Sequence, residues 1–357
     1  MNEANPTTSS PIEPIHGDVV WHGRDMAQRT DWIHHLERTE IGELENAIAR
    51  IRAQGTEIID VSKDDFPLPS LGPTLTQIRR DLVDGRGFAL IRGIPVDSWS
   101  REDVALAFWG IGRYLGEAIM QNRKGHVLGH VTDIGVDPTN PRFRGYQSAA
   151  DLMPHTDIAS DLVALLCLRP AKSGGLSMIA SASAIFNEIL ERRPNLAQVL
   201  TQPFYIDRRE EIPEGKKPYY QLPVFNPYRG KTTVCYIRRF VESAQRFDDV
   251  PALSQAQLEA MDLIDELAKS DAIRLDMDFQ PGDIQIVNNL TTLHSRTGYE
   301  DWPDPEQRRH LLRLWFAVSD GWPLPSAYFE RYDADEHGRP RGVTVPGVRP
   351  VASLEPV

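Results

Sequence analysis

Residues 152–170 read LMPHTDIASDLVALLCLRP, a short polar motif that runs into a continuous apolar segment. The apolar segment Leu162–Leu168 has the length of a buried strand, and Pro170 stops it. In extended chain, residues two apart point to the same side, so the side chains of His155 and Asp157 can face one metal ion. A helix would separate them. We therefore predict a metal-binding motif beside a buried β-strand.

The His-x-Asp pattern alone is a weak signal, because His-x-Asp/Glu also occurs at His16 and His35. His155 differs from these two because a buried strand follows it and because His294, further along the chain, follows another expected strand. Two histidines and one carboxylate from distant strands form the facial triad that holds non-haem Fe(II) and leaves coordination positions open. We therefore predict that His155, Asp157 and His294 are metal ligands.

A second informative pattern lies at residues 308–315, which read RRHLLRLW. In an extended strand, Arg309 and Arg313 share one face with Leu311 and Trp315. Two arginines that point inward from an apolar strand are unfavourable unless each meets an anion. A guanidinium group matches a carboxylate in a bidentate geometry. The pattern predicts either a bound anionic ligand or a structural ion pair with a buried acidic residue.

Short strands and amphipathic helices make up most of the remaining chain. We expect strands near residues 87–93, 162–168, 176–180, 273–279, 284–287 and 311–318. We expect helices near residues 39–54, 75–84, 100–115 and 184–193, and another that begins at 254. Short strands joined by turns and decorated by helices predict a mainly β fold, with a double-stranded β-helix (jelly-roll) core and peripheral helices.

The sequence predicts a single domain over residues 19–357, preceded by a mobile tail at 1–18 that is rich in Pro, Ser and Thr. Its expected parts are a helical N-terminal cover at 19–85, a jelly-roll core at about 86–320 and a C-terminal extension at 321–357. Within the core, residues 201–232 contain five prolines among many charged residues. This composition predicts a long, irregular, lid-like insert with at most one short hairpin.

The composition limits the classes of partner. The 357 residues include 39 Lys+Arg and 51 Asp+Glu, a formal net charge of −12, with no long basic run. This argues against nucleic acid or an anionic membrane as partner. Two cysteines cannot form a disulfide framework, and nowhere do about 18 apolar residues run together. We expect a cytoplasmic protein that acts on a small molecule, and a homo-oligomer is compatible with the sequence.

Several motifs follow one another in a specific order along the chain. They are His155-x-Asp157, Gly174-Gly175-x-Ser177, Pro281-Gly282-Asp283, His294, Arg309 and Arg313. In this order and spacing, over roughly residues 80–320, the sequence resembles the taurine dioxygenase/TfdA family, within the clavaminate synthase-like Fe(II)/2-oxoglutarate-dependent oxygenases. The resemblance implies a jelly-roll oxidoreductase, a dioxygenase that uses Fe(II), 2-oxoglutarate and O₂.

The resemblance also implies roles for individual residues. The three metal-ligand candidates would bind iron, and no further catalytic residue is implied. Arg309 matches the arginine that grips the distal carboxylate of 2-oxoglutarate, and Ser177 matches a family threonine whose hydroxyl touches the same carboxylate. Arg313 matches an arginine that reaches the substrate's acidic group or the cosubstrate. His294 and Arg309 are 15 residues apart, further than in the taurine enzyme, so both arginines remain candidates for the main anchor.

The implied reaction is hydroxylation, or another oxidation of an unactivated C–H bond, of a small anionic molecule with release of succinate and CO₂. Residues 121–153 lead into the metal motif and are expected to line the substrate pocket. Our candidates for substrate contact are Arg313, Arg123, Tyr146 and Gln147. Two alternatives stay open: a cupin-like metal enzyme that does not use 2-oxoglutarate, and a non-catalytic jelly-roll binding protein.

Overall fold

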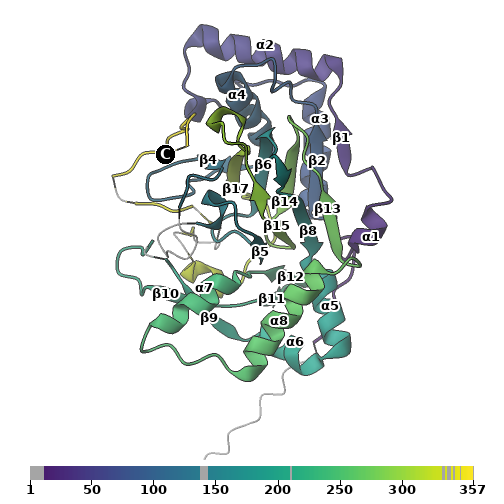
Figure 1. The fold of residues 1–357 in the computed structure, drawn as a ribbon, viewed down its shortest axis with the longest axis vertical. Coiled ribbons are helices and arrows are strands. Elements are labelled where there is room, and N and C mark those ends of the chain that lie inside the picture. Colours follow the sequence, from purple (N-terminus) through teal and green to yellow (C-terminus); the bar gives the residue numbers. More distant parts are fainter. Residues whose placement is uncertain are drawn as a thin grey trace, which may run out of the picture.

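Two β-sheets that face each other form the centre of the molecule (Figure 1). The computed structural model describes residues 12–136, 144–209, 211–331, 334–335, 339–340, 342–345 and 347–356. The larger sheet has the strand order β1-β2-β14-β6-β17-β3, and β4 also pairs with β17. Its strands are β1 (Ile33–His35), β2 (Phe88–Arg92), β14 (Ile284–Asn288), β6 (Leu162–Arg169), β17 (His310–Ala317), β3 (Glu117–Ala118) and β4 (Leu128–Val131).

The smaller sheet has the order β13-β8-β15-β5. Its strands are β13 (Arg274–Met277), β8 (Ser177–Ser181), β15 (Thr292–Arg296) and β5 (Leu152–His155). All its pairs are antiparallel, as are those of the larger sheet apart from β1 with β2. The two facing sheets confirm the expected jelly-roll core.

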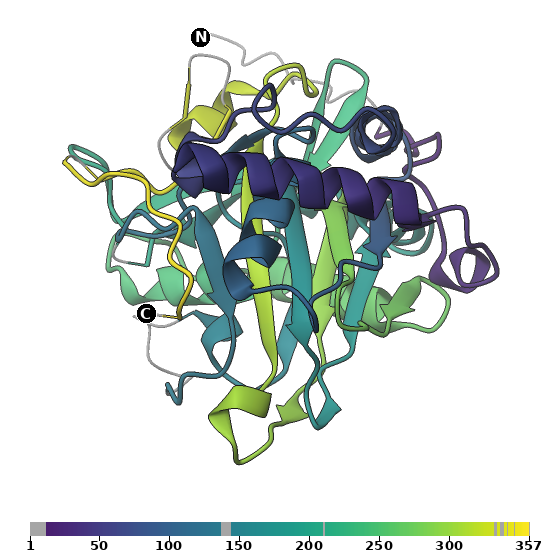
Figure 2. The same ribbon diagram turned by 90° about the horizontal axis from the view of Figure 1, so that it is seen from above.

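Helices cover the outer faces of both sheets. The larger sheet is covered by α2 (Arg38–Gln54), α3 (Leu71–Val83) and α4 (Arg101–Gly112), and Figure 2 shows α2 lying across its strands. The smaller sheet is covered by α5 (Ala182–Arg192) and α8 (Gln255–Lys269), with α6 (Pro194–Leu200) packed on both. Shorter elements are α1 (Gly23–Met26), α7 (Arg238–Ser243), and the paired strands β7 (Ser173–Gly174) and β16 (Tyr299–Glu300). The peripheral helices are confirmed, and they make the fold a mixed α/β one.

Strand β17 separates two environments. Leu312, Leu314 and Phe316 point outward and pack beneath the helices of the larger sheet. Leu311 and Trp315 point inward, between the sheets. This is the alternation that the sequence predicts, because neighbouring residues of a strand face opposite ways. The same alternation turns the side chains of Arg309 and Arg313 toward the interior.

Local signals in the sequence set most helix ends. Gly55 ends α2 with a left-handed φ of 67°, and the hydroxyl of Ser100 caps α4 by accepting the backbone N–H of Asp103. Ser254 and Gln257 form the expected capping box of α8. Pro194 differs from expectation: α5 ends before it, but Pro194 also begins α6, because proline fits the first turn of a helix, where its missing N–H has no partner to lose.

Residues 201–232 are more regular than the sequence suggests. Strands β9 (Pro203–Asp207) and β10 (Tyr219–Pro223) pair with each other, and so do β11 (Phe225–Tyr228) and β12 (Lys231–Val234). The expectation of a long irregular loop was therefore wrong. Three of the prolines lie within these strands, at strand ends or in a two-stranded pair with a free edge, where a missing N–H is tolerated. The lid-like role of the segment stays a prediction.

The turn Pro281-Gly282-Asp283 ties the larger sheet together before β14. Gly282 has a φ of 85°, and a Cβ atom there would lie 2.1 Å from the carbonyl oxygen of Ile94, so only glycine fits. The Asp283 carboxylate is fully buried and accepts hydrogen bonds of 2.8 and 2.7 Å from the Arg92 guanidinium. This motif of the family resemblance therefore has a structural role.

The two ends of the described chain are attached to the core. Ile15 exchanges two backbone hydrogen bonds with the Asn187 side chain, so ordered chain begins earlier than the expected residue 19. The tail residues 1–11 lie outside the described part. Near the other end, Arg331 donates a hydrogen bond to the carbonyl of Ile158, beside the metal motif. Among the described residues, no helix has both the length and the apolar character needed to cross a membrane.

Candidate active site

The structure brings the three predicted metal ligands together at one end of the smaller sheet. His155 ends β5 and His294 lies directly opposite it on β15. One potential ligand atom from each of His155, Asp157 and His294 lies within 4.8 Å of the other two. His155 Nδ1 lies 2.8 Å from the carbonyl of Met153, which leaves Nε2 available as a ligand. These donors fit a 2-His-1-carboxylate iron site with open coordination positions.

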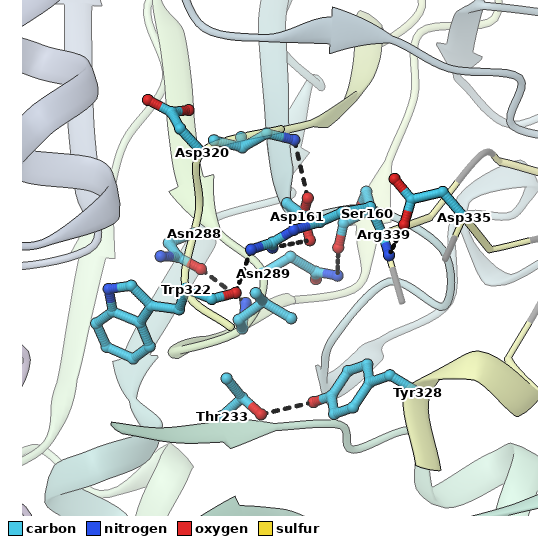
Figure 3. A network of polar contacts seen from close by, with 12 residues as sticks. Ser160, Asp161, Thr233, Asn288, Asn289, Asp320, Trp322, Tyr328, Asp335 and Arg339 are labelled. Atoms are coloured by element: carbon cyan, nitrogen blue, oxygen red, sulfur yellow. Dashed lines mark hydrogen bonds and ion pairs between the residues drawn. The ribbon is translucent and has the colours of Figure 1, made fainter. Parts of the chain in front are cut away.

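The loop that carries Asp157 is fixed by Asn289, the residue after β14. The Asn289 side chain accepts the backbone N–H of Asp157 at 2.7 Å and donates to the carbonyls of Asp157 and Ser160 at 2.7 and 2.9 Å. Asp161, at the end of the loop, binds Arg339 at 3.5 Å (Figure 3). The chain downstream of the core therefore helps to hold the metal motif.

Asp157 is kept as an ionised acceptor. Its Oδ2 atom accepts a 2.7 Å hydrogen bond from the indole N–H of Trp315 and lies 3.5 Å from Nη1 of Arg313. Burial acts to raise the pKa of Asp157, but the charge of Arg313 and the two nearby histidines bring it below the usual value. Burial and the neighbouring His155 lower the pKa of His294 to about 3. A neutral imidazole and an ionised carboxylate are the forms that bind metal.

A cavity of about 450 Å³ lies against the triad. Its wall includes Gln121, Tyr146, Phe240, Arg313 and Trp315. It has a predominantly apolar wall with a few polar groups, as is usual for a small-molecule site. The triad thus faces enough space for an organic substrate of moderate size.

Arg313 is held in place by neighbours on several sides. Its Nε donates 2.8 Å to Gln121, and its guanidinium lies 4.3 Å from the centre of the Tyr146 ring and 4.8 Å from that of Trp315. Gln121 is itself oriented by donating to the carbonyls of Val127 and Arg313, both at 2.8 Å. Arg313 is therefore a preorganised cation at the inner wall of the cavity.

Of the other three expected substrate contacts, one lies at the cavity wall. Tyr146 lines the cavity. Gln147 does not, because its side-chain oxygen accepts the backbone N–H of Arg144 at 3.0 Å and closes a short turn. Arg123 is exposed and is absent from the cavity wall as the structure describes it.

Two of the cosubstrate candidates, Ser177 and Arg309, are buried and are absent from the cavity wall as the structure describes it. Arg309 comes just before β17 and is only 3% exposed, and its Nη1 atom has no hydrogen-bond partner among the residues that the structure describes. Ser177 begins β8, and its hydroxyl oxygen lies 3.2 Å from the amide nitrogen of Gln285 on the opposite sheet. Gly175 leaves room for the arginine, since a Cβ atom there would lie 3.1 Å from Nε of Arg309. The interior therefore contains a second polar region beside the triad.

Comparison with known proteins decides the family. The model of the family described as taurine catabolism dioxygenase TauD, TfdA family, matches residues 49–315. The chain belongs to the TauD/TfdA family. FR-33289 synthase of Streptomyces rubellomurinus (strain ATCC 31215) is 32% identical to this TauD/TfdA protein over 321 residues, covering 88% of the chain and 94% of the synthase.

Solved structures show the same fold. Asparagine oxygenase in complex with Fe(II), 3-hydroxyasparagine and succinate matches with a TM-score of 0.60 and 18% identity, covering 80% of this chain and 93% of that one. The non-haem iron oxygenase OrfP in complex with Fe and α-ketoglutaric acid matches with a TM-score of 0.60 and 16% identity, with the same coverage. The sequence resemblance is thus confirmed, and this TauD/TfdA protein belongs to a family of Fe(II)/2-oxoglutarate-dependent oxygenases.

Some residues of the TauD/TfdA site are not evident from sequence. Gln121 orients Arg313, Asn289 fixes the Asp157 loop, and Arg296 lies two residues beyond His294 on β15. The segment Thr292–Arg296 lacks an apolar alternation, so the strand was not expected there. Only its pairing with β5 and β8 shows that His294 and Arg296 share the inward face.

Proposed function

We propose that this TauD/TfdA enzyme hydroxylates an unactivated C–H bond of a small organic anion. The observation that best supports this is the placement of the His155, Asp157 and His294 donors against a cavity that also contains the Arg313 guanidinium. Bound Fe(II) and 2-oxoglutarate supply the oxidising chemistry, in which O₂ gives one oxygen atom to the substrate while 2-oxoglutarate becomes succinate and CO₂. The chain's own residues bind and orient these partners.

In this proposal His155, Asp157 and His294 hold the iron. The hydrogen bonds from Trp315 to Asp157 and between His155 and Met153 fix the orientation of two ligands before the metal binds. The third, His294, has a buried Nδ1 atom that meets no partner in the described part of the chain. Because the donor set is prearranged, little reorganisation accompanies metal binding.

Arg309 and Ser177 take the distal carboxylate of 2-oxoglutarate in this proposal. The unpartnered and buried Nη1 atom of Arg309 supports the role, since a buried cationic donor is stabilised by an anionic acceptor. Ser177 offers one O–H donor nearby on the smaller sheet. Arg313 is less suited to this role because Gln121 and Asp157 already engage it.

Arg313 instead gives the substrate pocket a positive inner wall. It lies at the cavity beside the metal ligand Asp157, while Tyr146 stacks on its guanidinium. A substrate carboxylate, sulfonate or phosphonate placed against Arg313 would hold its neighbouring C–H bonds close to the triad. The family description names taurine, a sulfonate, which fits an anionic substrate.

Anaerobic titration of the protein with Fe(II) and 2-oxoglutarate tests the proposal. We expect the weak visible metal-to-ligand charge-transfer band of a 2-oxoglutarate complex. Aerobic incubation with panels of small carboxylates, sulfonates and phosphonates should then form succinate in equal amount to hydroxylated product. A folded, iron-loaded protein without the band would support the cupin-like enzyme instead, and a protein that binds no iron would support the non-catalytic binding protein.

The proposal also includes the cellular compartment of the enzyme, its partner and its oligomeric state. Both cysteines, Cys167 and Cys235, are buried free thiols, which suits a reducing cytoplasm. The partner is a small molecule, and a homo-oligomer remains compatible with the exposed surface. Size-exclusion chromatography with light scattering measures the oligomeric state directly.

A further inference from the structure

Beyond the triad, three side chains have buried donor atoms that meet no partner among the described residues, and these side chains lie close together. Arg309 lacks a partner at Nη1, Arg296 lacks one at Nε and Nη1, and Tyr299 lacks one at its hydroxyl group. Both guanidinium groups lie against the Tyr299 ring, at 4.5 Å for Arg296 and 5.2 Å for Arg309. Buried polar groups are almost always hydrogen-bonded, so a cluster of unmet donors indicates a missing acceptor.

The strand register places this cluster next to the expected cosubstrate site. Arg296 on β15 lies directly opposite Ser177 on β8, and cross-strand partners point to the same face of a sheet. Arg309 approaches from the larger sheet and touches the space left by Gly175. Ser177, Arg296, Tyr299 and Arg309 therefore surround one region between the sheets.

The charges around this region are not balanced by direct ion pairs. Two acidic groups near this region, Asp151 and Asp301, accept backbone N–H groups of Gly298 and Arg309 respectively. Neither forms an ion pair with Arg296 or Arg309 in the part of the chain that the structure describes. Two neighbouring guanidinium groups thus favour an anion between them.

We propose that Arg296 and Tyr299 join Arg309 as ligands of the distal carboxylate of 2-oxoglutarate. This inference rests on the proposed function and adds a second guanidinium and a phenol to its cosubstrate site. Two arginines and a hydroxyl match the lone pairs of one carboxylate, and the bound anion separates their positive charges. Arg296 keeps its remaining Nη2 bonds to the carbonyls of Ser148 and Ala150, which hold it in place.

Binding of two keto acids distinguishes contact with the distal carboxylate from a structural role. 2-Oxopentanoate has the same five-carbon chain as 2-oxoglutarate, but a methyl group replaces the distal carboxylate. Anaerobic titration of the Fe(II) protein, read by the charge-transfer band, gives the Kd of each acid. We expect Arg296→Met to weaken 2-oxoglutarate binding roughly 10- to 100-fold and to leave 2-oxopentanoate binding within about 2-fold.

Two further variants keep the test decisive if Arg296→Met is unstable. Tyr299→Phe removes one hydroxyl and should weaken only 2-oxoglutarate binding, by about 2- to 10-fold. Arg296→Lys retains the charge and should restore part of the selectivity for 2-oxoglutarate. Arg274→Met is the matched control, because Arg274 on β13 pairs with Asp276 at the surface; it should change neither Kd.

The inference is overturned if Arg296→Met and Tyr299→Phe weaken both acids equally, which indicates a structural role, or weaken neither. Failure of the proposed function gives a different result. In that case the wild-type protein shows no band with 2-oxoglutarate at all.

Discussion

The two inward-facing arginines of the β17 region occupy opposite environments. Arg313 bonds to Gln121, lies beside Asp157 and stacks on Tyr146. Arg309 also lies against a tyrosine ring, that of Tyr299, but its Nη1 has no partner among the described residues and a second arginine, Arg296, is nearby. An engaged arginine is held in position before any ligand arrives. A buried arginine with an unmet donor is stabilised by an anionic ligand that accepts from that donor. In our proposal, the same residue type therefore shapes a substrate wall in one place and forms a cosubstrate anchor in the other.

The largest expected effect comes from a change in the proposed metal site. Asp157→Ala deletes a proposed metal ligand and leaves the Trp315 indole N–H without its acceptor. We expect Fe(II) affinity to fall more than about 100-fold, beyond the 10- to 100-fold typical of residues that only support a ligand. Anaerobic equilibrium dialysis with iron analysis measures it. Asp276→Ala, at the surface of β13, should bind iron normally; a variant at 157 that also did so would remove Asp157 from the metal site.

Arg309→Met tests the arginine whose Nη1 donor is unmet. It removes a charged donor that we assign to the 2-oxoglutarate carboxylate, so the Kd for 2-oxoglutarate should rise by about 100-fold while iron affinity is retained. The charge-transfer titration and iron dialysis separate the two effects. Arg308→Met, which alters the adjacent and more exposed arginine, is the control. An unchanged Kd in Arg309→Met would contradict the assignment.

Ser177→Ala should have a smaller effect on the same site. It removes one neutral O–H donor, so we expect a 2-oxoglutarate Kd about 2- to 10-fold higher. Ser177→Thr keeps the hydroxyl and should bind 2-oxoglutarate as the wild type does. If Ser177→Ala and Ser177→Thr bound 2-oxoglutarate equally weakly, the size of the side chain rather than its hydrogen bond would explain the lower affinity.

Arg313→Met should have the smallest effect on cosubstrate affinity. Because Arg313 faces the substrate cavity, we expect the 2-oxoglutarate Kd to stay within about 3-fold, since only indirect effects through Asp157 remain. Succinate formation in the presence of a substrate found by panel screening should decline. If Arg313→Met weakened 2-oxoglutarate binding more than Arg309→Met, the two arginines would have exchanged roles.

The sequence carried enough information for the core and for the triad. Two central strands were predicted from their patterns of apolar residues. Residues 311–318 alternate along the chain, and residues 162–168 form a continuous apolar run of strand length. His155 and Asp157 are close in sequence, so their spacing was enough to predict that both side chains can face one metal ion. His294 required the order of motifs, since its own strand, Thr292–Arg296, is not recognisably apolar.

What the sequence did not reveal depends on contacts between distant segments. Arg296 lies opposite Ser177 because of the register of β15 with β8, which the sequence does not show. Gln147 and Tyr146 are neighbours, yet only Tyr146 lines the cavity, because the Gln147 side chain closes a turn with Arg144. Likewise, the pairing of β9 with β10 gave order to a segment whose prolines and charges predicted an irregular loop.

The support of the Asp157 loop has a consequence for how the chain can vary. Arg331 bonds to the carbonyl of Ile158, and Arg339 contacts Asp161, so residues outside the two sheets stabilise the loop that presents Asp157, the proposed iron ligand. If the contacts of Arg331 and Arg339 opened locally, the loop that carries Asp157 would become more mobile even with every proposed metal ligand intact. A lineage that shortens or diverges in this region must therefore acquire compensating contacts around Ser160, or lose tight control over the geometry of its metal.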